Sequence, residues 1–268
     1  MKNSELDNLR EELDNIDNQL IELITKRARI ALDISDFKKV NNLPIFHPAR
    51  EMVILRRIQK KIQNPMSIEL MWDIWRALIN ANTAIQASLT IFIEKTLSIE
   101  SKQLIYNYFG KQNKIIDSDS PIKNLGELNE KSDVISIVKT NNQEISTLDG
   151  KSFGIIGSLP GITNKHDNTD LFILGRANYI KTGSDLTVIS LTTNNKNIIF
   201  DKENIEMILN KSKITIRDIV AVSAESILII IEGFYDDKIE TDLNLSEMLS
   251  SCQINIIGVY PEPLVKGD

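Results

Sequence analysis

The N-terminal stretch carries apolar side chains with the spacing of a helix. From Leu6 to Lys39, leucine and isoleucine recur at steps of three and four residues, and neither glycine nor proline interrupts them. This spacing predicts one amphipathic helix, which at roughly 1.5 Å per residue is about 50 Å long. Because a small domain cannot cover such a helix alone, we expect an intertwined dimer of two chains.

Three cations interrupt this apolar stripe. At about 100° per residue, Arg27 and Lys38 fall near its centre and Arg10 falls at its edge. Burying an unpaired charge is costly, so these cations predict either carboxylate partners or an anionic ligand. Arg27 and Lys38 lie about 16 Å apart along the helix, close enough to converge on one small molecule. Arg10 lies about 25 Å from Arg27 along the helix, too far to share that ligand. If Arg10 serves the same kind of site, it must therefore come from another copy of the chain.

Two further helices follow the first. Pro44 ends the first helix, Pro48 begins the second, and a third runs from about residue 67 to residue 87. Asn82 and Gln86 continue the apolar face of the third helix, where either amide alone would indicate an ordinary interhelical hydrogen bond. Together with the cations of the first helix, the two amides predict one polar cavity between the helices.

The pattern changes after residue 89. Short strand-like runs alternate with helices near residues 101–109 and 121–129, which predicts an α/β or α+β region. From residue 185 to residue 260 the predicted order of elements is βαββαβ, the split ferredoxin-like pattern. The fold class is therefore multidomain, with an all-α three-helix region followed by a sheet region.

Composition narrows the possible function. The chain has 268 residues, of which 42% are hydrophobic and 25% charged, as in a globular protein of one to three domains. Its one cysteine, Cys252, predicts a buried structural thiol, fits a reducing cytoplasm and excludes an internal disulfide framework. No apolar run reaches the roughly 18 residues that span a bilayer, and the net charge of −6 argues against a nucleic-acid partner.

Motifs for common cofactors are absent from the sequence. It contains no GxGxxG, no Walker A loop, no zinc-ligand spacing and no Gly-x-Ser-x-Gly elbow. His47 and His166 lie in predicted loops with no second ligand nearby in sequence. We therefore expect no metal and no cofactor.

The helical region resembles a known family. The runs LREELDNIDNQLIELITKRARIA, FKK, PIFHPAREMVILRRI and IWRALINANTAIQ keep the spacings of the all-helical class of chorismate mutases, especially those fused to prephenate dehydratase. The resemblance covers about residues 4 to 90. It implies an intertwined helical homodimer and a cofactor-free isomerase that rearranges chorismate to prephenate in aromatic amino acid biosynthesis.

The resemblance also assigns roles to the three cations of the first helix. Arg10 matches the arginine that reaches into the partner chain's site to hold a substrate carboxylate. Arg27 matches the arginine that holds a carboxylate within its own chain. Lys38 matches the lysine that hydrogen-bonds the ether oxygen and a carboxylate.

Further site residues come from the second and third helices. By the same resemblance, Arg50 and Glu51 match an Arg-Glu pair whose glutamate takes the ring hydroxyl, and Gln86 matches the glutamine that faces the ether oxygen. The chain departs from the family at two substrate-binding positions. His47 stands where an acid is frequent and Asn82 where serine is common, and because both side chains still form hydrogen bonds, we expect altered affinity before lost activity.

The remainder resembles a shortened prephenate dehydratase followed by an ACT-type regulatory unit. The runs EGFYDD and INIIGVYP match closing strands of ACT domains, whereas Asp170 and Leu171 stand where the dehydratase motif has its reactive threonine and arginine. We therefore expect three domains: a mutase domain at 1–90, a degenerate dehydratase-like region at 91–182 and an ACT-like domain at 183–268.

Two other functions are compatible with the sequence. One is a bifunctional mutase and dehydratase, which phenylpyruvate formation from prephenate would reveal. The other is a non-catalytic regulator that keeps the helical dimer as a scaffold and binds a metabolite through its C-terminal unit. The cations on the apolar stripes argue against the regulator, since a scaffold does not need them.

Overall fold

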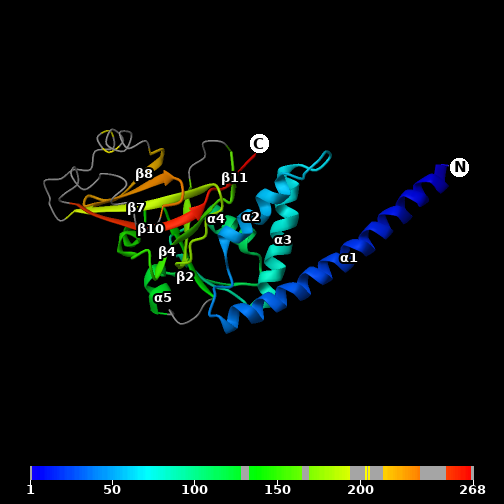
Figure 1. Cartoon of the computed structure of the whole chain (residues 1–268), viewed down its shortest axis with the longest axis horizontal. Coiled ribbons are helices and arrows are strands. Elements are labelled where there is room, and N and C mark those ends of the chain that lie inside the picture. Colours follow the sequence, from blue (N-terminus) through cyan, green and yellow to red (C-terminus); the bar gives the residue numbers. More distant parts are fainter. Residues whose placement is uncertain are drawn as a thin grey trace.

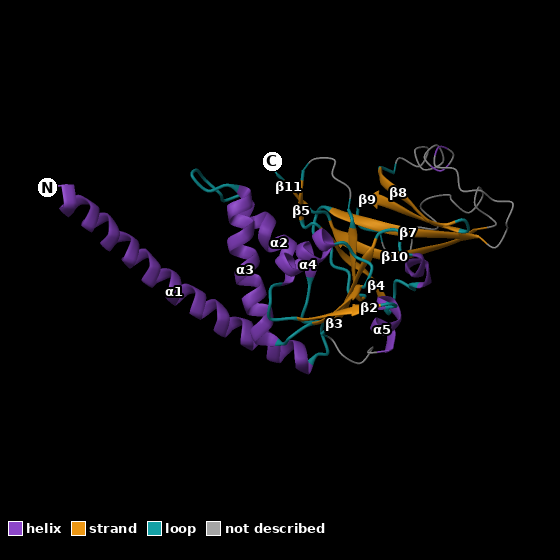
Figure 2. Ribbon diagram, turned by 180° about the vertical axis from the view of Figure 1, so that it is seen from behind, coloured by secondary structure: helices purple, strands orange, loops and turns teal. Residues whose placement is uncertain are grey.

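The protein combines three N-terminal helices with a large mixed sheet (Figure 1). This computed structural model describes residues 2–127, 133–164, 169–193, 203, 205, 214–235 and 252–266. The predicted fold class is confirmed at this level: a helical region comes first and a sheet region with helices follows. The helices α2 and α3 stand against one end of the sheet region, and α1 extends away from it (Figures 1 and 2).

The three predicted helices are present with bounds close to those expected. They are α1 (Lys2–Val40), α2 (Pro48–Gln59) and α3 (Ile68–Gln86). Side chains cap the N-termini of the second and third: His47 Nδ1 accepts from the Arg50 N–H at 3.3 Å, and Ser67 Oγ accepts from the Leu70 N–H at 3.2 Å.

Short helices accompany the sheet. They are α4 (Ile99–Phe109), α5 (Pro121–Glu127) and the 3₁₀ helix η1 (Gln143–Thr147). Two very short strands, β5 (Ile162–Thr163) and β11 (Leu264–Val265), form a separate parallel pair.

The large sheet runs through the whole region after α3. Among the described residues it has nine strands, in the spatial order β2-β1-β3-β6-β4-β10-β7-β9-β8. In chain order these strands are β1 (Thr90–Glu94), β2 (Lys114–Ser118), β3 (Val134–Lys139), β4 (Phe153–Leu159), β6 (Leu171–Arg176), β7 (Asp185–Thr193), β8 (Ile216–Ser223), β9 (Ser226–Glu232) and β10 (Cys252–Pro261).

Parallel and antiparallel pairing divide the sheet. The strands β2, β1 and β3 are parallel, with α4 as the crossover between β1 and β2. The strand β6 pairs antiparallel with β3 and with β4, and β10 joins β4 in parallel where Gly258 faces Ile155. The predicted boundary at 182 and 183 thus lies between strands of one continuous sheet.

The last four strands are those of the predicted βαββαβ unit. Their spatial order, β10-β7-β9-β8, is the fourth, first, third and second strand of that unit, and all three pairings are antiparallel. Its two predicted helices, near residues 204–209 and 245–251, lie almost wholly outside the described residues. Cys252, predicted to be buried, is only partly buried because it lies at the first position of β10.

One hydrophobic core joins α2 and α3 to the sheet. Leu55 of α2 and Met71 of α3 are 1% and 0% exposed, and they belong to the same cluster as Ile91 of β1 and Ile173 of β6. The loop before β5 also touches α3 closely: a Cβ atom on Gly161 would lie 2.5 Å from the Trp72 ring, so this contact requires glycine. Helices and sheet therefore pack as one unit.

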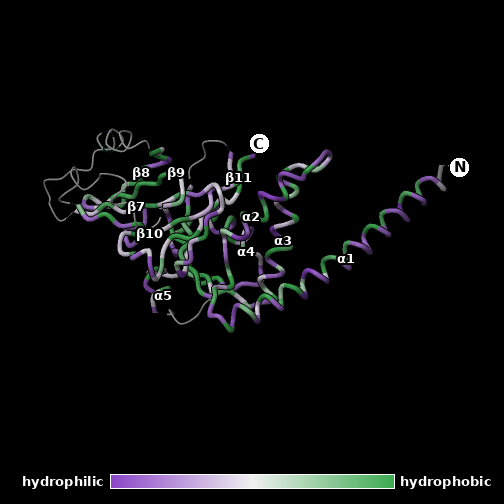
Figure 3. Tube along the Cα trace, in the orientation of Figure 1, coloured by the Kyte–Doolittle hydropathy of each residue, from purple (hydrophilic) through white to green (hydrophobic). Residues whose placement is uncertain are grey.

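The N-terminal part of α1 lies outside this core. Apolar and polar residues alternate along it in Figure 3, yet its apolar stripe faces solvent: Leu13 is 61% exposed and Leu20 is 48% exposed. Ala31 and Ser35 are the buried residues of α1 among those described, and both lie in its C-terminal part, where α1 packs on α3.

Candidate active site

A cavity of about 320 Å³ lies where the C-terminal half of α1 meets α2 and α3. Seven of the eight residues singled out from the sequence line this one cavity: Arg27, Lys38, His47, Arg50, Glu51, Asn82 and Gln86. They come from all three helices and the loop before α2. A volume of this size suits a small molecule.

The two cations of α1 enter the cavity from one face of the helix. Arg27 and Lys38 are three turns apart, which places them on the same side. Each donates to a main-chain carbonyl: Arg27 Nη1 to the Leu78 oxygen at 3.2 Å, and Lys38 Nζ to the Ile45 oxygen at 2.8 Å. Among the described residues neither cation has an ion-pair partner, so their charge is available to an anion.

Burial changes the protonation behaviour of these cations. It lowers the pKa of the Arg27 guanidinium and, more consequentially, the pKa of the Lys38 ammonium below that of a free lysine. At Lys38 the nearby Glu51 carboxylate opposes this change. A bound anion would favour the charged form of both groups.

The start of α2 supplies the next group of side chains. Arg50 and Glu51 lie in its first turn, directly after His47, whose Nδ1 accepts the N-cap hydrogen bond and therefore must be unprotonated. Burial, followed by the Lys38 charge, lowers the pKa of His47, which keeps the ring neutral. Glu51 is only 7% exposed and pairs with Arg76 of α3 at 2.7 Å.

Several polar atoms on the cavity wall have no partner. Within the described part of the chain, His47 Nε2, Asn82 Oδ1 and Gln86 Oε1 are buried and form no hydrogen bond. The two amides use their nitrogens on their own helix: Asn82 Nδ2 donates to the Leu78 oxygen at 2.5 Å, and Gln86 Nε2 donates to the Asn82 oxygen at 3.1 Å. Because an unsatisfied buried polar atom costs about 1–3 kcal/mol, this wall favours a polar ligand.

The charge of the cavity is strongly positive although the whole chain is acidic. Four cationic side chains line it, and Glu51 is the one carboxylate in that lining. Since Glu51 already pairs with Arg76, an anionic ligand meets little repulsion. The cavity thus selects for an anion by local charge.

Three polar side chains in or beside this cavity were not predicted. Arg57 and Thr83 also line the cavity, and Arg76, which lies outside the lining, forms an ion pair with Glu51. The sequence contained a signal for both arginines: Arg57 follows Arg50 by seven residues and so shares its helix face, and Arg76 interrupts the apolar stripe of α3.

Arg10 is the predicted residue that lies away from the cavity. It is on the exposed part of α1, where its Nη1 pairs with Asp7 at 3.2 Å and its side chain is 65% exposed. In one chain, therefore, Arg10 contacts nothing in the cavity.

The two predicted dehydratase positions lie at the beginning of β6. Asp170 is exposed before β6, and Leu171 is 1% exposed in the shared core. In the described parts of the chain, histidine, cysteine and acidic residues form no cluster of three or more that could hold a metal. The described helices include none with the length and apolar character to cross a membrane.

Comparison with known proteins identifies the helical region. The model of the family described as chorismate mutase type II matches residues 9–87. A chorismate mutase of Methanocaldococcus jannaschii is 30% identical over 95 residues, which are 35% of this chain and 93% of that protein. A bifunctional chorismate mutase/prephenate dehydratase of Aquifex aeolicus is 29% identical over 110 residues, which are 40% of this chain and 30% of that protein.

The match to the bifunctional relative thus spans less than a third of that protein. Among solved structures, prephenate dehydratase from Streptococcus mutans aligns with a TM-score of 0.42 and 12% identity, covering 65% of this chain and 97% of that one. A TM-score of this size supports no conclusion on the sheet region. For the helical region the sequence match is decisive: the chain belongs to the type II chorismate mutase family.

Proposed function

We propose that residues 1–90 form a chorismate mutase domain that rearranges chorismate to prephenate without a cofactor. One observation supports this above all. Seven of the eight candidate site residues of one chain, far apart in sequence, line a single cationic cavity of about 320 Å³. A non-catalytic scaffold would not need this set.

The proposed substrate suits the charges of the cavity. Chorismate is a dianion, and bidentate arginines bind carboxylates well. In the proposed complex Arg27 holds one carboxylate, Lys38 contacts a carboxylate and the ether oxygen, and Glu51 accepts the hydrogen bond of the ring hydroxyl. Arg50 and the unpredicted Arg57 add positive charge on α2.

The rearrangement is pericyclic, so it needs neither nucleophile nor base. The protein can confine the compact diaxial conformer and stabilise the negative charge that develops on the ether oxygen. Lys38 and Gln86 perform the second task in this proposal. Gln86 must turn its amide by 180° to donate, because its Nε2 donates to the Asn82 oxygen and its Oε1 is unpaired.

The hydrogen bonds of the cavity are sufficient in number and strength for the transition-state stabilisation that catalysis requires. A rate gain of about a millionfold corresponds to about 8 kcal/mol. A few charge-assisted hydrogen bonds of about 1.5–3 kcal/mol each reach that sum. The departures at His47 and Asn82 leave polar atoms on the wall, and we propose that both residues bind substrate.

We further propose that the active unit is a homodimer in which Arg10 completes the site of the partner subunit. The exposed apolar stripe of α1 supports this proposal, because a second copy of the chain would bury side chains such as Leu13 and Leu20, which are about half exposed in one chain. The distance along α1 supports it too, because Arg10 cannot reach the cavity of its own chain.

For the rest of the chain we propose two domains within one sheet. Residues 91–182 form a degenerate dehydratase-like region, and residues 183–268 form an ACT-like unit with a regulatory or structural role. The antiparallel order β10-β7-β9-β8 supports the second assignment. A cytoplasmic location stays a prediction from the sequence.

The direct test is the loss of chorismate with purified full-length protein. We expect saturable conversion to prephenate with no added metal or cofactor, even in the presence of a chelator. No loss at millimolar chorismate would contradict the proposal and favour the non-catalytic regulator.

A second assay addresses the bifunctional alternative. Prephenate is supplied and phenylpyruvate is measured. We expect none, because Leu171 is buried in the core and cannot act in a cleft. Appreciable turnover would overturn the description of the sheet region as degenerate.

A further inference from the structure

Arg76 is a buried cation with partners in both regions of the protein. The residue is 4% exposed, on the face of α3 that turns toward the sheet region. Its Nη1 donates to Glu51 Oε2 at 2.7 Å, and its Nη2 donates to Asn80 Oδ1 at 3.0 Å. Its guanidinium carbon lies 4.2 Å from the centroid of the Tyr108 ring.

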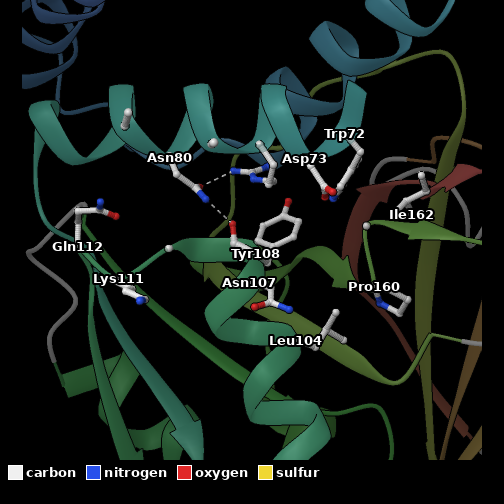
Figure 4. A pocket seen from close by; sticks show the side chains of 15 residues that line it. Trp72, Asp73, Asn80, Leu104, Asn107, Tyr108, Lys111, Gln112, Pro160 and Ile162 are labelled. Atoms are coloured by element: carbon white, nitrogen blue, oxygen red, sulfur yellow. Dashed lines mark hydrogen bonds between the residues drawn. The ribbon is translucent and has the colours of Figure 1, made fainter. Parts of the chain in front are cut away.

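The contact to α4 is fixed by a second hydrogen bond. Asn80 Nδ2 donates to the main-chain oxygen of Tyr108 at 2.8 Å, so Asn80 links α3 to α4 as Figure 4 shows. Tyr108 is 7% exposed and belongs to the core shared by helices and sheet. The guanidinium therefore lies between a carboxylate of α2 and a ring of α4.

The Arg76 guanidinium stays charged in this buried position. Burial lowers the pKa of Arg76, but the interactions with Glu51 and Tyr108 together raise this pKa by more. The net shift is therefore upward. A buried carboxylate without such a partner would be strongly destabilised. Arg76 thus holds the Glu51 side chain in place beside the cavity.

Glu51 contacts both Arg76 and the cavity. One oxygen, Oε2, is held by Arg76, while the same side chain lines the cavity. Fixing one oxygen orients the carboxylate plane and with it the direction in which Glu51 can accept a ligand hydroxyl. Arg76 itself is not in the lining of that cavity.

We infer that Arg76 is a positioning residue for the mutase reaction, acting through Glu51, and that Tyr108 and Asn80 make its position depend on α4. This inference rests on the proposed mutase function. It gives the sheet region a defined part in the helical site: α4 supplies the surface against which the Arg76–Glu51 pair is set.

A double-mutant cycle on the full-length chain tests the inference. The four proteins are wild type, Arg76→Gln, Glu51→Gln and the double variant, with kcat and KM for chorismate measured on each. If Arg76 acts through Glu51, Arg76→Gln lowers kcat/KM by about tenfold or more, yet costs nothing further once Glu51 is Gln. Independent, multiplying losses would overturn the inference.

Folding is controlled with a conservative variant. Arg76→Gln leaves Glu51 buried without a cation, so thermal unfolding is recorded for all proteins and only folded variants enter the cycle. Arg76→Lys keeps the charge but loses the second hydrogen-bond arm, and we expect it to recover part of kcat. A folded Arg76→Lys protein with wild-type kcat and KM would show that the geometry of the pair does not matter.

The contribution of α4 has a matched pair of variants. Tyr108→Leu removes the ring under Arg76, whereas Tyr106→Leu changes an exposed tyrosine, 47% exposed, on the same helix. We expect Tyr108→Leu to lower kcat about threefold to tenfold, with no effect in the Glu51→Gln background, and Tyr106→Leu to leave it unchanged. Equal effects of the two variants would overturn the role of α4.

The wild-type measurement separates the two proposals. An active wild type with a multiplying cycle refutes the positioning role alone. A wild type that does not convert chorismate refutes the proposed function, and the positioning role with it.

Discussion

The two parts of the helical region have the same kind of sequence pattern but different surroundings. Leu55 in α2 and Met71 in α3 are 1% and 0% exposed in a core shared with the sheet, whereas Leu13 and Leu20 in α1 are 61% and 48% exposed. All four follow a helical period of apolar residues. The pattern therefore predicts that a helix face is buried, but it does not predict whether the residues that cover this face belong to the same chain.

The candidate site lies where these two parts meet. Lys38 and Arg27 come from the last turns of α1, which pack on α3, while Arg10 lies on the uncovered part of the same helix. A site completed by a second chain joins the two parts.

The largest effect is expected on the exposed stripe of α1. Changing Leu13 and Leu20 together to Asp places two carboxylates in the proposed dimer interface, and we expect mutase activity to fall by more than about a thousandfold as the dimer dissociates. Sedimentation and chorismate turnover are measured on the same samples. Asn18→Asp, on the opposite face of α1, is the matched control and should remain dimeric and active.

Lys38→Ala is expected to have the next largest effect. Removing a donor to a developing negative charge usually costs about 10²–10³ in kcat, and we expect a loss in that range with little change in thermal unfolding. The neighbouring Lys39→Ala is the control, because Lys39 is exposed and pairs with Asp36 on its own helix. Similar kinetics for the two variants would contradict the assigned role of Lys38.

A substitution of Arg56, which links α2 to the sheet region, is expected to lower stability without changing the mutase reaction. Arg56 donates to Thr182 Oγ1, the Ser184 oxygen and the Glu262 oxygen at 2.7, 2.8 and 2.6 Å. Arg56→Met removes these three hydrogen bonds between α2 and partly buried acceptors, so we expect the free energy of unfolding to fall by about 2 kcal/mol.

The adjacent arginine provides the comparison for that variant. Arg57 is exposed, and Arg57→Met should change the free energy of unfolding by less than about 0.5 kcal/mol. Denaturant unfolding measures both proteins. If Arg57→Met is the more destabilising of the two, the packing of α2 on the sheet is not as described.

The smallest effect concerns pH. Because burial lowers the pKa of Lys38, with Glu51 opposing, the charged form is present at neutral pH and is lost as pH rises through a value below 10.5. We expect kcat/KM to be level near pH 7 and to fall about tenfold per pH unit above that pKa. In Lys38→Arg the cation persists, so this alkaline fall should disappear, and a fall that survives the substitution would have another origin.

Much of the helical region could be predicted because its elements are long and local. The period of the apolar residues, Pro48 at the start of α2 and Ser67 as the cap of α3 act within a few residues of one another. Placing Arg27 and Lys38 on one helix face needs only the helical repeat. His47, Arg50 and Glu51 were placed in the site by the family resemblance, and they line the same cavity as these two cations.

The features that were not predicted depend on contacts between distant segments. Arg76 meets Glu51 across 25 residues of chain and then Tyr108 of α4, and no local period specifies that meeting. The continuity of the sheet is similar, since β10 joins β4 at Gly258 and Ile155 after a long separation in sequence. Such pairings follow from tertiary packing.

The most direct test of a site shared between two chains is complementation by subunit exchange. Arg10→Ala and Lys38→Ala proteins are each assayed alone, then mixed in equal amounts under conditions where exchange of labelled chains is observed. Each mixed dimer would contain one site with both residues intact. We expect activity to recover to about a quarter of the wild-type rate per chain, because half of the dimers are mixed and each has one intact site. Demonstrated exchange without recovery would mean that Arg10 does not act across the dimer.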